Sequence, residues 1–365
     1  MRKRIKIQSK FEQVYDYIIN KIKKDMTVGD KFLTETKVAD LLCVNRMTVA
    51  KVMSVLKSEG YIDRKQGIGT IILKKPKQNV RDGIITVLPY VNIGSLKDKY
   101  FSKLFNTIFL ESLNMGLVNT SVGSKGEKQK IIDFEQIDNL YSSEKYQGIV
   151  IMNPRKQGVN EWENYFRNRK IIIVWVGMST DVSNRINCID SDNKEGSINA
   201  TRYLFELGYR KLGFLSRKLD TTNREDRLYG FEKAYEEKKF NLGRNQIVIV
   251  KDVESSKEAG YMGMKRFIEN DIKLDALFVA DEGLLYGIEE ARKEYPNKSI
   301  FSLPMITFDY ELPGQFSNVI ASVIQPITEM GTLAVKIINQ IYKGNMKQPV
   351  KKMLKVKLVK RSGVE

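Results

Sequence analysis

The sequence predicts an α/β protein with a small amino-terminal domain of three helices and a hairpin, followed by a larger two-lobed domain with parallel sheets. Within the first 75 residues, three amphipathic helical segments precede a glycine-containing hairpin pattern. From Ile84 onward, short apolar strands alternate with amphipathic helices. The 365 residues also exceed the usual size of one domain core, which favours a small domain plus a larger two-lobed one.

The composition is that of a globular protein, with 42% apolar and 29% charged residues. The longest apolar run, Ile171 to Val176, is far shorter than the roughly 20 residues that span a bilayer. The basic start, Met1 to Ile7, is not followed by the apolar segment of an export signal. Cys43 and Cys188 lie far apart without a CxxC pair, which favours two free thiols in a reducing cytoplasm.

The chain contains no histidine. This absence removes the commonest general base, the Ser-His-Asp and Cys-His catalytic arrangements, and the usual ligand sets of zinc and non-haem iron. Carboxylate or lysine chemistry stays open, but the composition favours a binding protein over an enzyme. We expect no cofactor and no metal.

The net charge of +17 is concentrated at the amino end. Residues 1–82 contain 19 Lys and Arg against 9 Asp and Glu, whereas residues 83–365 contain 42 against 35. Lysine and arginine that neutralise phosphates release condensed counterions on binding. The asymmetry therefore predicts a polyanion partner for the amino-terminal domain, with a merely solvated basic surface as the alternative.

The first helix is predicted to begin at Ser9, because Ser9 and Glu12 have the spacing of a capping box. The segment ends at Val28-Gly29-Asp30. Apolar residues recur between these limits at helical spacing and form one stripe that must be buried, namely Phe11, Val14, Tyr15, Ile18, Ile19 and Ile22.

Two short helices follow, in the pattern of a helix-turn-helix. Thr34 is the predicted cap of one and Asn45 of the other, with a break at Cys43-Val44 and a left-handed stop at Gly60. Their buried faces are predicted to be Val38, Leu41 and Leu42 in the second helix and Val49, Val52, Met53 and Leu56 in the third.

The third helix carries the residues best suited to read DNA. Asn45, Arg46 and Thr48 lie in its first turn, while Arg46 and Lys51 point away from the apolar stripe. A recognition helix presents its amino-terminal residues to base edges, and arginine can bridge guanine O6 and N7. An exposed, capped helix with incidental charges is the alternative.

A hairpin is predicted after Gly60, with Tyr61 to Arg64 and Thr70 to Leu73 as strands around a glycine-containing turn. Arg64, Lys65 and Gln66 at its tip suit a contact with the minor groove or the phosphate backbone. A hairpin without a DNA contact would explain the glycines equally well.

The stretch FLTETKVADLLCVNRMTVAKVMSVLKSEGYIDRKQGIGTIIL resembles the winged helix-turn-helix of GntR-family regulators, over about residues 8 to 75. The resemblance implies that Arg46 and Thr48 contact the major groove and that Gly67 lets the wing approach the minor groove. Thr36 and Ala50 stand where the family usually or often has arginine, so we expect neighbouring lysines to substitute. The expected DNA contacts are Thr34, Glu35, Lys37, Asn45, Arg46, Thr48, Lys51, Arg64, Lys65, Gln66 and Gly67.

A polar, basic connector bounded by proline and glycine separates the two predicted domains. The expected limits are 1–75 for the DNA-binding domain, 76–83 for the linker and 84–365 for the larger domain. The larger domain is predicted to contain strands at Ile84 to Leu88, Leu117 to Thr120, Gly148 to Met152, Ile171 to Val176, Lys211 to Leu215, Gln246 to Val250, Ala276 to Ala280 and Met305 to Phe308.

Charged side chains follow several of these strands, where doubly wound proteins bind ligands. Asp281 and Asp309 each come directly after a strand, and Arg227 lies in the helix that follows another. A carboxylate pair with an arginine would satisfy the hydroxyl groups of a polyol. An interlobe salt bridge or a helix cap fits the same residues.

The order of segments over residues 83 to 362 resembles the effector domain of LacI/GalR-type regulators, which is similar to periplasmic sugar-binding proteins. INCIDSDNKEGSINATRYLFELGYRKLGFLS and ITFDYE are among the stretches that carry the resemblance. Gly177 and Ser255 depart from the pattern, standing where many members have aspartate or an aromatic residue. Trp175 could replace the lost stacking surface, or could be an ordinary buried residue. The implied effector contacts are Tyr100, Phe101, Trp175, Arg227, Asp281, Asp309 and Gln325.

The same pairing of domains is found in the arabinose-repressor type of GntR regulator. It implies a homodimeric transcription regulator, a repressor by default, that binds double-stranded operator DNA and responds to a monosaccharide, first of all a pentose or a deoxyhexose. A sugar-binding or sugar-modifying protein without a regulatory role is the alternative.

Overall fold

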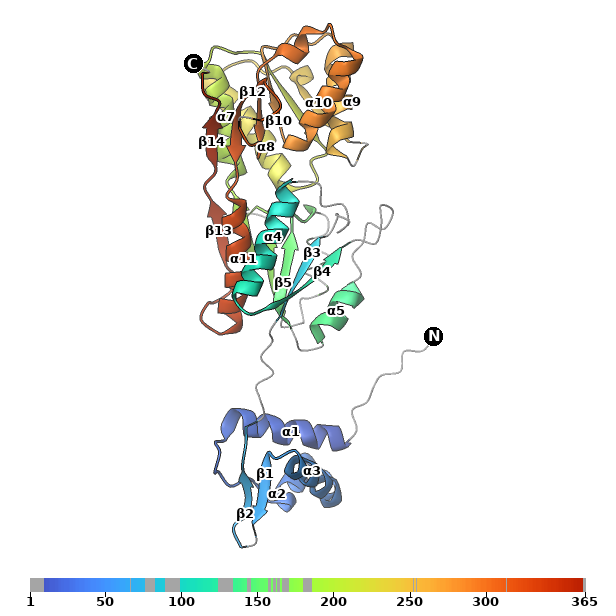
Figure 1. Cartoon of the computed structure of the whole chain (residues 1–365), viewed down its shortest axis with the longest axis vertical. Coiled ribbons are helices and arrows are strands. Elements are labelled where there is room, and N and C mark those ends of the chain that lie inside the picture. Colours follow the sequence, from blue (N-terminus) through green and yellow to red (C-terminus); the bar gives the residue numbers. More distant parts are fainter. Residues whose placement is uncertain are drawn as a thin grey trace, which may run out of the picture. The chain divides into compact units, whose positions relative to one another are not determined.

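The computed structural model describes residues 10–65, 67–75, 83–88, 99–123, 134–142, 146–156, 159, 162, 165, 171–179, 186–251, 253, 255–312 and 314–363. The predictions for Ser9, for Gln66 and for most of the linker lie outside these residues. Contacts within the chain divide it into two compact units, Met1–Val80 and Arg81–Glu365. Figure 1 shows the elements of both units. The domain limits proposed from the sequence stay a prediction.

Within its described residues, the amino-terminal unit contains three helices and a two-stranded antiparallel sheet. Lys65 pairs with Gly69 across the turn of the hairpin. The predicted apolar faces form one core, in which Val14, Ile18 and Ile22 of the first helix are fully buried. Phe11 and Leu41, both predicted to be buried, are exposed. The elements are α1 Lys10–Asp25, α2 Glu35–Leu42, α3 Arg46–Ser58, β1 Ile62–Lys65 and β2 Gly69–Ile72.

The larger unit contains two parallel sheets, here called lobe 1 and lobe 2 with the helices that cover them. In the part of the chain that the structure describes, the lobe 1 sheet has the strand order β13-β7-β6-β5-β3-β4. Its strands are β3 Gly83–Leu88, β4 Val118–Gly123, β5 Tyr146–Met152, β6 Ile172–Val176, β7 Asn187–Ser191 and β13 Lys351–Leu354, and its helices are α4 Lys99–Asn114, α5 Phe134–Ser142 and α11 Ile327–Tyr342.

The lobe 2 sheet has the order β14-β12-β11-β10-β8-β9 among the described strands, and only β14 of these runs antiparallel to its neighbour. The elements are β8 Leu212–Arg217, β9 Ile247–Val250, β10 Ala276–Val279, β11 Met305–Phe308, β12 Val319–Ile324 and β14 Lys357–Lys360, with α7 Asn193–Glu206, α8 Thr222–Lys238, α9 Ser256–Glu269, α10 Glu282–Glu294 and short 3-10 turns at Arg244–Gln246 and Ser299–Ser302.

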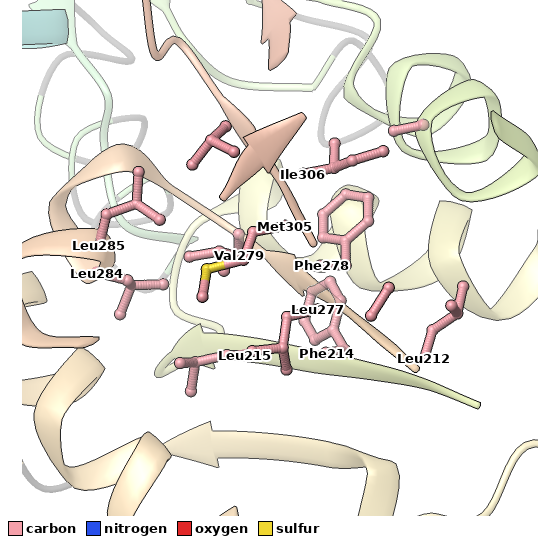
Figure 2. Packing of buried hydrophobic residues seen from close by; sticks show 14 of the residues in the cluster. Leu212, Phe214, Leu215, Leu277, Phe278, Val279, Leu284, Leu285, Met305 and Ile306 are labelled. Carbon is pink, nitrogen blue, oxygen red and sulfur yellow. The ribbon is translucent and has the colours of Figure 1, made fainter. Parts of the chain in front are cut away.

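Each sheet is covered by apolar residues on both faces. In lobe 1, Ile84 and Leu88 of β3 pack with α4 and α11, while Ile85 and Val87 of the same strand pack on the opposite side with α5. Figure 2 shows the lobe 2 core, where side chains of β8, β10 and β11 meet residues from α10. The α/β fold with parallel sheets in two lobes, predicted from the alternation of strands and helices, is confirmed.

The chain passes between the lobes three times within the described residues. It leaves lobe 1 where β7 ends at Ser191 and α7 begins at Asn193. It returns where β12 ends at Ile324 and α11 begins at Ile327, and it crosses again between β13 and β14. These crossovers form the hinge. The sequence did not predict β7, β12, β13 or β14, which are the strands that flank it.

Each strand predicted in the larger unit is present, with limits that differ by a few residues. No helix in the described part of the chain is long and apolar enough to cross a membrane.

Candidate functional site

Two predicted caps set the geometry of the helix-turn-helix. The Thr34 hydroxyl accepts a hydrogen bond from the Lys37 amide at 3.4 Å, and the Asn45 side chain accepts one from the Met47 amide at 2.8 Å. Cys43, between the helices, has a left-handed backbone with φ of 52°. Both predicted caps are confirmed, and they fix where α2 and α3 begin.

The face of α3 opposite the core is exposed at its amino-terminal end, where the apolar Met47 lies among polar residues. Val49 and Val52 are buried, whereas Arg46 and Lys51 project to the surface and Thr48 is partly covered. The first turn therefore presents a cation and a hydroxyl group on an accessible surface. This arrangement suits the major groove, because the amide groups of a helix start also favour phosphate.

Glu35 of α2 joins the start of α3 to the wing. Its carboxylate lies 3.5 Å from Nε of Arg46 and accepts a hydrogen bond from the guanidinium of Arg64 on β1. Two cations against one carboxylate leave a net positive charge. The predicted contacts Glu35, Arg46 and Arg64 thus form one cluster, in which Glu35 positions the arginines.

The wing turn depends on glycine. Gly67 has φ of 79° and Gly69 has φ of 105°, in the left-handed region that residues with side chains rarely adopt. The Ile68 amide donates to the Lys65 carbonyl at 3.0 Å and closes the turn. Lys65 and Gly67 are exposed, so the described tip is accessible to a partner.

In the larger unit, Arg227 of α8 is a buried cation close to groups of both lobes. Its side chain is only 5% exposed, and its guanidinium lies over the Phe308 ring with the Cζ atom 3.8 Å from the ring centroid. It donates from Nε to Asn193 Oδ1 at 2.8 Å and from Nη1 to the Ala280 carbonyl at 2.7 Å. These contacts fix the guanidinium plane.

Carboxylates surround this arginine. Burial lowers the pKa of Arg227, and Asp309, Asp281, Tyr100 and Asp190 act against the burial by favouring the charged form. The predicted residues Arg227, Asp281, Asp309 and Tyr100 are therefore within electrostatic range of one another, although Tyr100 belongs to lobe 1 and the other three to lobe 2.

Asp309 and Gln325 form a rigid pair at the carboxyl ends of β11 and β12. Asp309 has φ of 59°, and its Oδ1 accepts a hydrogen bond from the Gln325 amide at 2.9 Å. The Gln325 side-chain amide donates to the other carboxylate oxygen. Asp281 stands directly before α10 and makes no side-chain capping bond there. The carboxylates thus lie at the strand ends, as predicted.

Lobe 1 contributes residues to the candidate effector site from the first turn of α4 and from the ends of two strands, β5 and β6. The rings of Tyr100 and Phe101 meet edge to face at a centroid distance of 5.6 Å. A Cβ atom added to Gly177, which has φ of 78°, would lie 2.8 Å from the Tyr100 hydroxyl and 3.4 Å from Asn153 Oδ1. The space that a side chain at Gly177 would occupy is therefore taken by Tyr100 and Asn153.

The prediction that Trp175 provides a stacking face is wrong. Its side chain is 2% exposed and lies in the core of lobe 1, on the face of the sheet that packs with α5. The ring meets Trp162 edge to face at 5.9 Å. Side chains alternate along a strand, so Trp175 points to the opposite face from the neighbouring Val174 and Val176, which pack with α4 and α11.

Four polar residues that the sequence reasoning missed lie near Arg227 or at strand ends of lobe 1: Asn153, Asp190, Ser191 and Asn193. Asn153 follows β5 with φ of 41°, and its buried Oδ1 has no hydrogen-bond partner among the described residues. Burial raises the pKa of Asp190 to about 8, although Arg227 acts in the opposite direction. Asn153 directly follows a buried strand, and this position could have identified it as a candidate site residue, as it did for Asp281 and Asp309.

A cluster of ion pairs joins the two lobes. The Asp220 carboxylate of lobe 2 accepts Arg224 Nη1 at 2.6 Å and lies 3.1 Å from Nε of Arg155 in lobe 1. The Lys156 amide donates to the Asp220 carbonyl at 3.1 Å, and the Lys156 side chain reaches Glu225. We call these five residues the Asp220 clasp.

Comparisons with known proteins agree with both halves of this description. Residues 10–72 match the family model of bacterial regulatory proteins of the gntR family. Over 162 residues the chain is 30% identical to the HTH-type transcriptional regulator MalR of Streptococcus pneumoniae, covering 44% of this chain and 46% of that protein. Over 245 residues it is 27% identical to the arabinose metabolism transcriptional repressor of Geobacillus stearothermophilus, covering 62% and 60%. The matches thus span about half the length of these curated relatives.

Solved structures share the fold across most of the chain. The transcriptional regulator CelR in complex with cellobiose has a TM-score of 0.66 at 16% identity and covers 91% of this chain and 100% of its own. CcpA of Lactococcus lactis has a TM-score of 0.63 at 17% identity, with 77% and 98% covered. The resemblance to GntR-type and LacI-type regulators predicted from the sequence is confirmed.

Proposed function

We propose that this chain, in which a gntR-family DNA-binding domain precedes a body with the fold of LacI-type regulators, is a sequence-specific transcription regulator whose affinity for operator DNA is controlled by a small effector. One observation carries the proposal. The chain combines an exposed cationic helix start, braced by Glu35, with a buried arginine, Arg227, that lies near the carboxylates of Asp281 and Asp309. The first arrangement suits a duplex and the second suits a small polar molecule.

The DNA contacts are proposed to be those expected from the sequence. Arg46 and Thr48 at the start of α3 would meet base edges, while Arg64, Lys65 and Gly67 of the wing would follow the backbone or the minor groove. Because phosphate contacts release counterions, operator affinity should fall as the salt concentration rises.

The effector is proposed to be a neutral monosaccharide. Arg227 offers donors, and the carboxylates of Asp281 and Asp309 offer acceptors, so each hydroxyl of a polyol can find a partner. The same two carboxylates disfavour an anionic ligand. Tyr100 and Asn153 would contact the sugar from lobe 1, with Phe101 and Gln325 beside them. The names of the relatives support a sugar, and the arabinose repressor makes a pentose our first candidate.

The active form is proposed to be a cytoplasmic homodimer that acts as a repressor without enzymatic activity. A single winged helix reads one half-site, and two-fold symmetry matches a palindromic operator. Phe109, Leu110 and Leu113 of α4, with Val118 of β4, expose apolar side chains near one another on lobe 1. A second copy of the chain would cover this patch.

Two substitutions test the proposal. Arg46→Ala should weaken binding to a DNA fragment from the protein's own genomic neighbourhood by about 1–3 kcal/mol, the range for losing a good base contact, and leave sugar binding intact. Arg227→Ala should do the reverse. DNA binding is measured by fluorescence anisotropy, and sugar binding by thermal shift with a panel of pentoses and deoxyhexoses.

Lys57→Ala, at the far end of α3, and Arg202→Ala, in an exposed pair with Glu237, serve as matched controls. Normal DNA binding by Arg46→Ala would show that the DNA surface is wrongly assigned. Sugar turnover during the thermal-shift assay would favour an enzyme instead.

A further inference from the structure

A continuous set of buried hydrogen bonds runs through the hinge between the lobes. Its two ends are Asp309 and Arg227, two charged groups that lie within electrostatic range of each other. Its middle members are Gln325, Ser191 and Asn193, all nearly inaccessible to solvent. We call these five residues the hinge chain.

The first half of the hinge chain belongs to the crossover from β12 to α11. Gln325 lies in this crossover and holds both carboxylate oxygens of Asp309, one through its backbone amide at 2.9 Å and the other through its side-chain amide. Its side-chain carbonyl then accepts a hydrogen bond from the Ser191 hydroxyl. Each polar group of the Gln325 side chain is thus used within the chain.

The second half belongs to the crossover from β7 to α7. Ser191 is the last residue of β7, and its carbonyl and hydroxyl oxygens accept hydrogen bonds from the Asn193 side-chain amide at 3.0 and 3.2 Å. Asn193, the first residue of α7, accepts at Oδ1 from Arg227 Nε at 2.8 Å. The side-chain amide of Asn193 therefore links Ser191 at the hinge to Arg227, so the position of Ser191 affects the orientation of the guanidinium group.

The bond between Ser191 and Gln325 joins two crossovers that lie 134 positions apart in sequence. A change in the angle between the lobes must alter the backbone at both crossovers, because both connect lobe 1 to lobe 2. In a buried network each member is costly to leave unpaired, so its members move together. A ligand held by Arg227 and Asp309 would therefore act on both crossovers at once.

We propose that Ser191 and Asn193 are positioning residues that hold Arg227 and Asp309 in register and couple the two crossovers of the hinge into one unit. Neither residue needs to touch the effector. The inference rests on the proposed function only in taking Arg227 and Asp309 as effector contacts; the mechanical coupling is a property of the folded chain.

Hydrogen exchange at the Gln325 amide tests the coupling in the full-length protein. This amide donates to Asp309, so its exchange reports whether that end of the hinge chain is closed. Ser191→Ala removes the central hydroxyl, and Asn193→Ala removes the link to Arg227. Both should speed exchange at Gln325 by about two- to tenfold, the equivalent of one net hydrogen bond. The amide of Phe278, in the lobe 2 core, serves as the internal reference for global unfolding.

Ser216→Ala is the matched control, because Ser216 is a fully buried serine whose hydroxyl has no hydrogen-bond partner within the described residues. It should leave exchange at Gln325 unchanged. Unaltered exchange at Gln325 in Ser191→Ala, or an equal increase in Ser216→Ala, would overturn the proposal. If Asn193→Ala fails to fold, Ser191→Ala decides alone. The measurement needs neither operator nor sugar, so its result is separable from failure of the proposed function.

Discussion

Glu35 and Arg46 form an ion pair that links the two helices of the helix-turn-helix, with 3.5 Å between the carboxylate and Nε. The same carboxylate holds Arg64 of the wing. Both arginines remain substantially exposed, so Glu35 orients them without withdrawing them from a partner. The pairing explains why an acidic residue stands in a surface that is otherwise basic.

We predict that Glu35→Gln reduces discrimination between operator and scrambled DNA. The amide cannot hold two guanidinium groups by charge, so Arg46 and Arg64 sample more orientations. Loss of the carboxylate also raises non-specific attraction to phosphate. The difference in binding free energy between the two duplexes should fall by about 1–2 kcal/mol, which is part of the value of a bidentate base contact. Anisotropy titrations with both duplexes measure it.

The control for this prediction is Asp63→Asn, which removes a charge from the neighbouring pair with Lys57, 3.1 Å away, but leaves both arginines in place. An equal loss of discrimination in both variants would show that net charge, and not the orientation of the arginines, determines the effect.

The DNA-binding unit could be predicted closely from the sequence because its signals are local. Thr34 and Asn45 cap the helices that follow them within a few residues, and a left-handed glycine such as Gly67 is tied to one tight turn. The hinge is different. Ser191 meets Gln325 only because two crossovers that are distant in sequence lie side by side in the fold. No residue spacing in the sequence indicates that these two side chains are in contact.

The residues near Arg227 could be predicted in part, because ligand-binding residues in doubly wound proteins follow the carboxyl ends of strands. Asp281 and Asp309 follow apolar strands, whereas β7, which leads to Ser191 and Asn193, has the sequence NCIDS and lacks an apolar pattern. Trp175 shows the converse error. It was considered as a replacement for the aromatic stacking surface missing at Ser255, but the alternation of side chains turns it into the core of lobe 1.

We predict that the lobe carrying Asp190 is more stable near pH 5 than near pH 8. Burial raises the pKa of Asp190 to about 8, with smaller contributions in the same direction from Asp226 and Asp192. Between the ordinary aspartate pKa and this value, the folded state binds a proton that the unfolded state does not. Stability therefore increases as the pH falls through this window and is lost as it rises.

Asp190→Asn should flatten this dependence, because the amide is neutral throughout and can still accept from the Ser191 amide. Thermal unfolding followed by tryptophan fluorescence measures it, since Trp162 and Trp175 both lie in lobe 1. Glu206→Gln, at an exposed position at the end of α7, is the control and should keep the wild-type slope. A wild-type slope in Asp190→Asn would contradict the prediction.

We predict that Asp220→Asn lets the two lobes move apart. Arg155 and Arg224 would lose the carboxylate between them, and Arg224 is largely buried, with burial as the first cause that lowers its pKa to about 10. Loss of a hydrogen bond to a charged group costs about 1.5–3 kcal/mol, so the balance between closed and open lobes should shift. Small-angle scattering should show a larger radius of gyration.

The comparison variant is Asp271→Asn, which removes a carboxylate from an exposed pair with Lys273 within lobe 2. Exposed pairs contribute little, so its scattering should match the wild type. Identical profiles for wild type and Asp220→Asn would show that the Asp220 clasp does not hold the lobes together.

We predict that Leu110→Glu combined with Leu113→Glu converts the proposed homodimer to a monomer. The two side chains are 57% and 52% exposed on α4. Charges placed at the centre of an apolar interface would have to be desolvated on association. Sedimentation velocity measures the mass of the particle. Tyr229→Glu, at a position 50% exposed on lobe 2, should stay dimeric; dissociation of that variant as well would argue for a general effect of charge.

We predict that Gly177→Ala destabilises the larger unit by more than backbone strain alone. Gly177 has φ of 78°, and an added Cβ atom would lie 2.8 Å from the Tyr100 hydroxyl. The left-handed backbone costs about 1–2 kcal/mol for a residue with a side chain. Gly208, with φ of 93° and open space where its Cβ atom would stand, isolates that strain. Chemical denaturation of Gly177→Ala and Gly208→Ala should therefore differ by the steric contact alone.

Adding Tyr100→Phe to Gly177→Ala should recover that difference, because the hydroxyl that the methyl group meets is gone, while the backbone strain stays. The same substitution added to Gly208→Ala should recover nothing. Full additivity of Gly177→Ala and Tyr100→Phe would mean that the two positions do not compete for space. In that case Tyr100 would not be the reason that glycine, and not a residue with a side chain, follows β6.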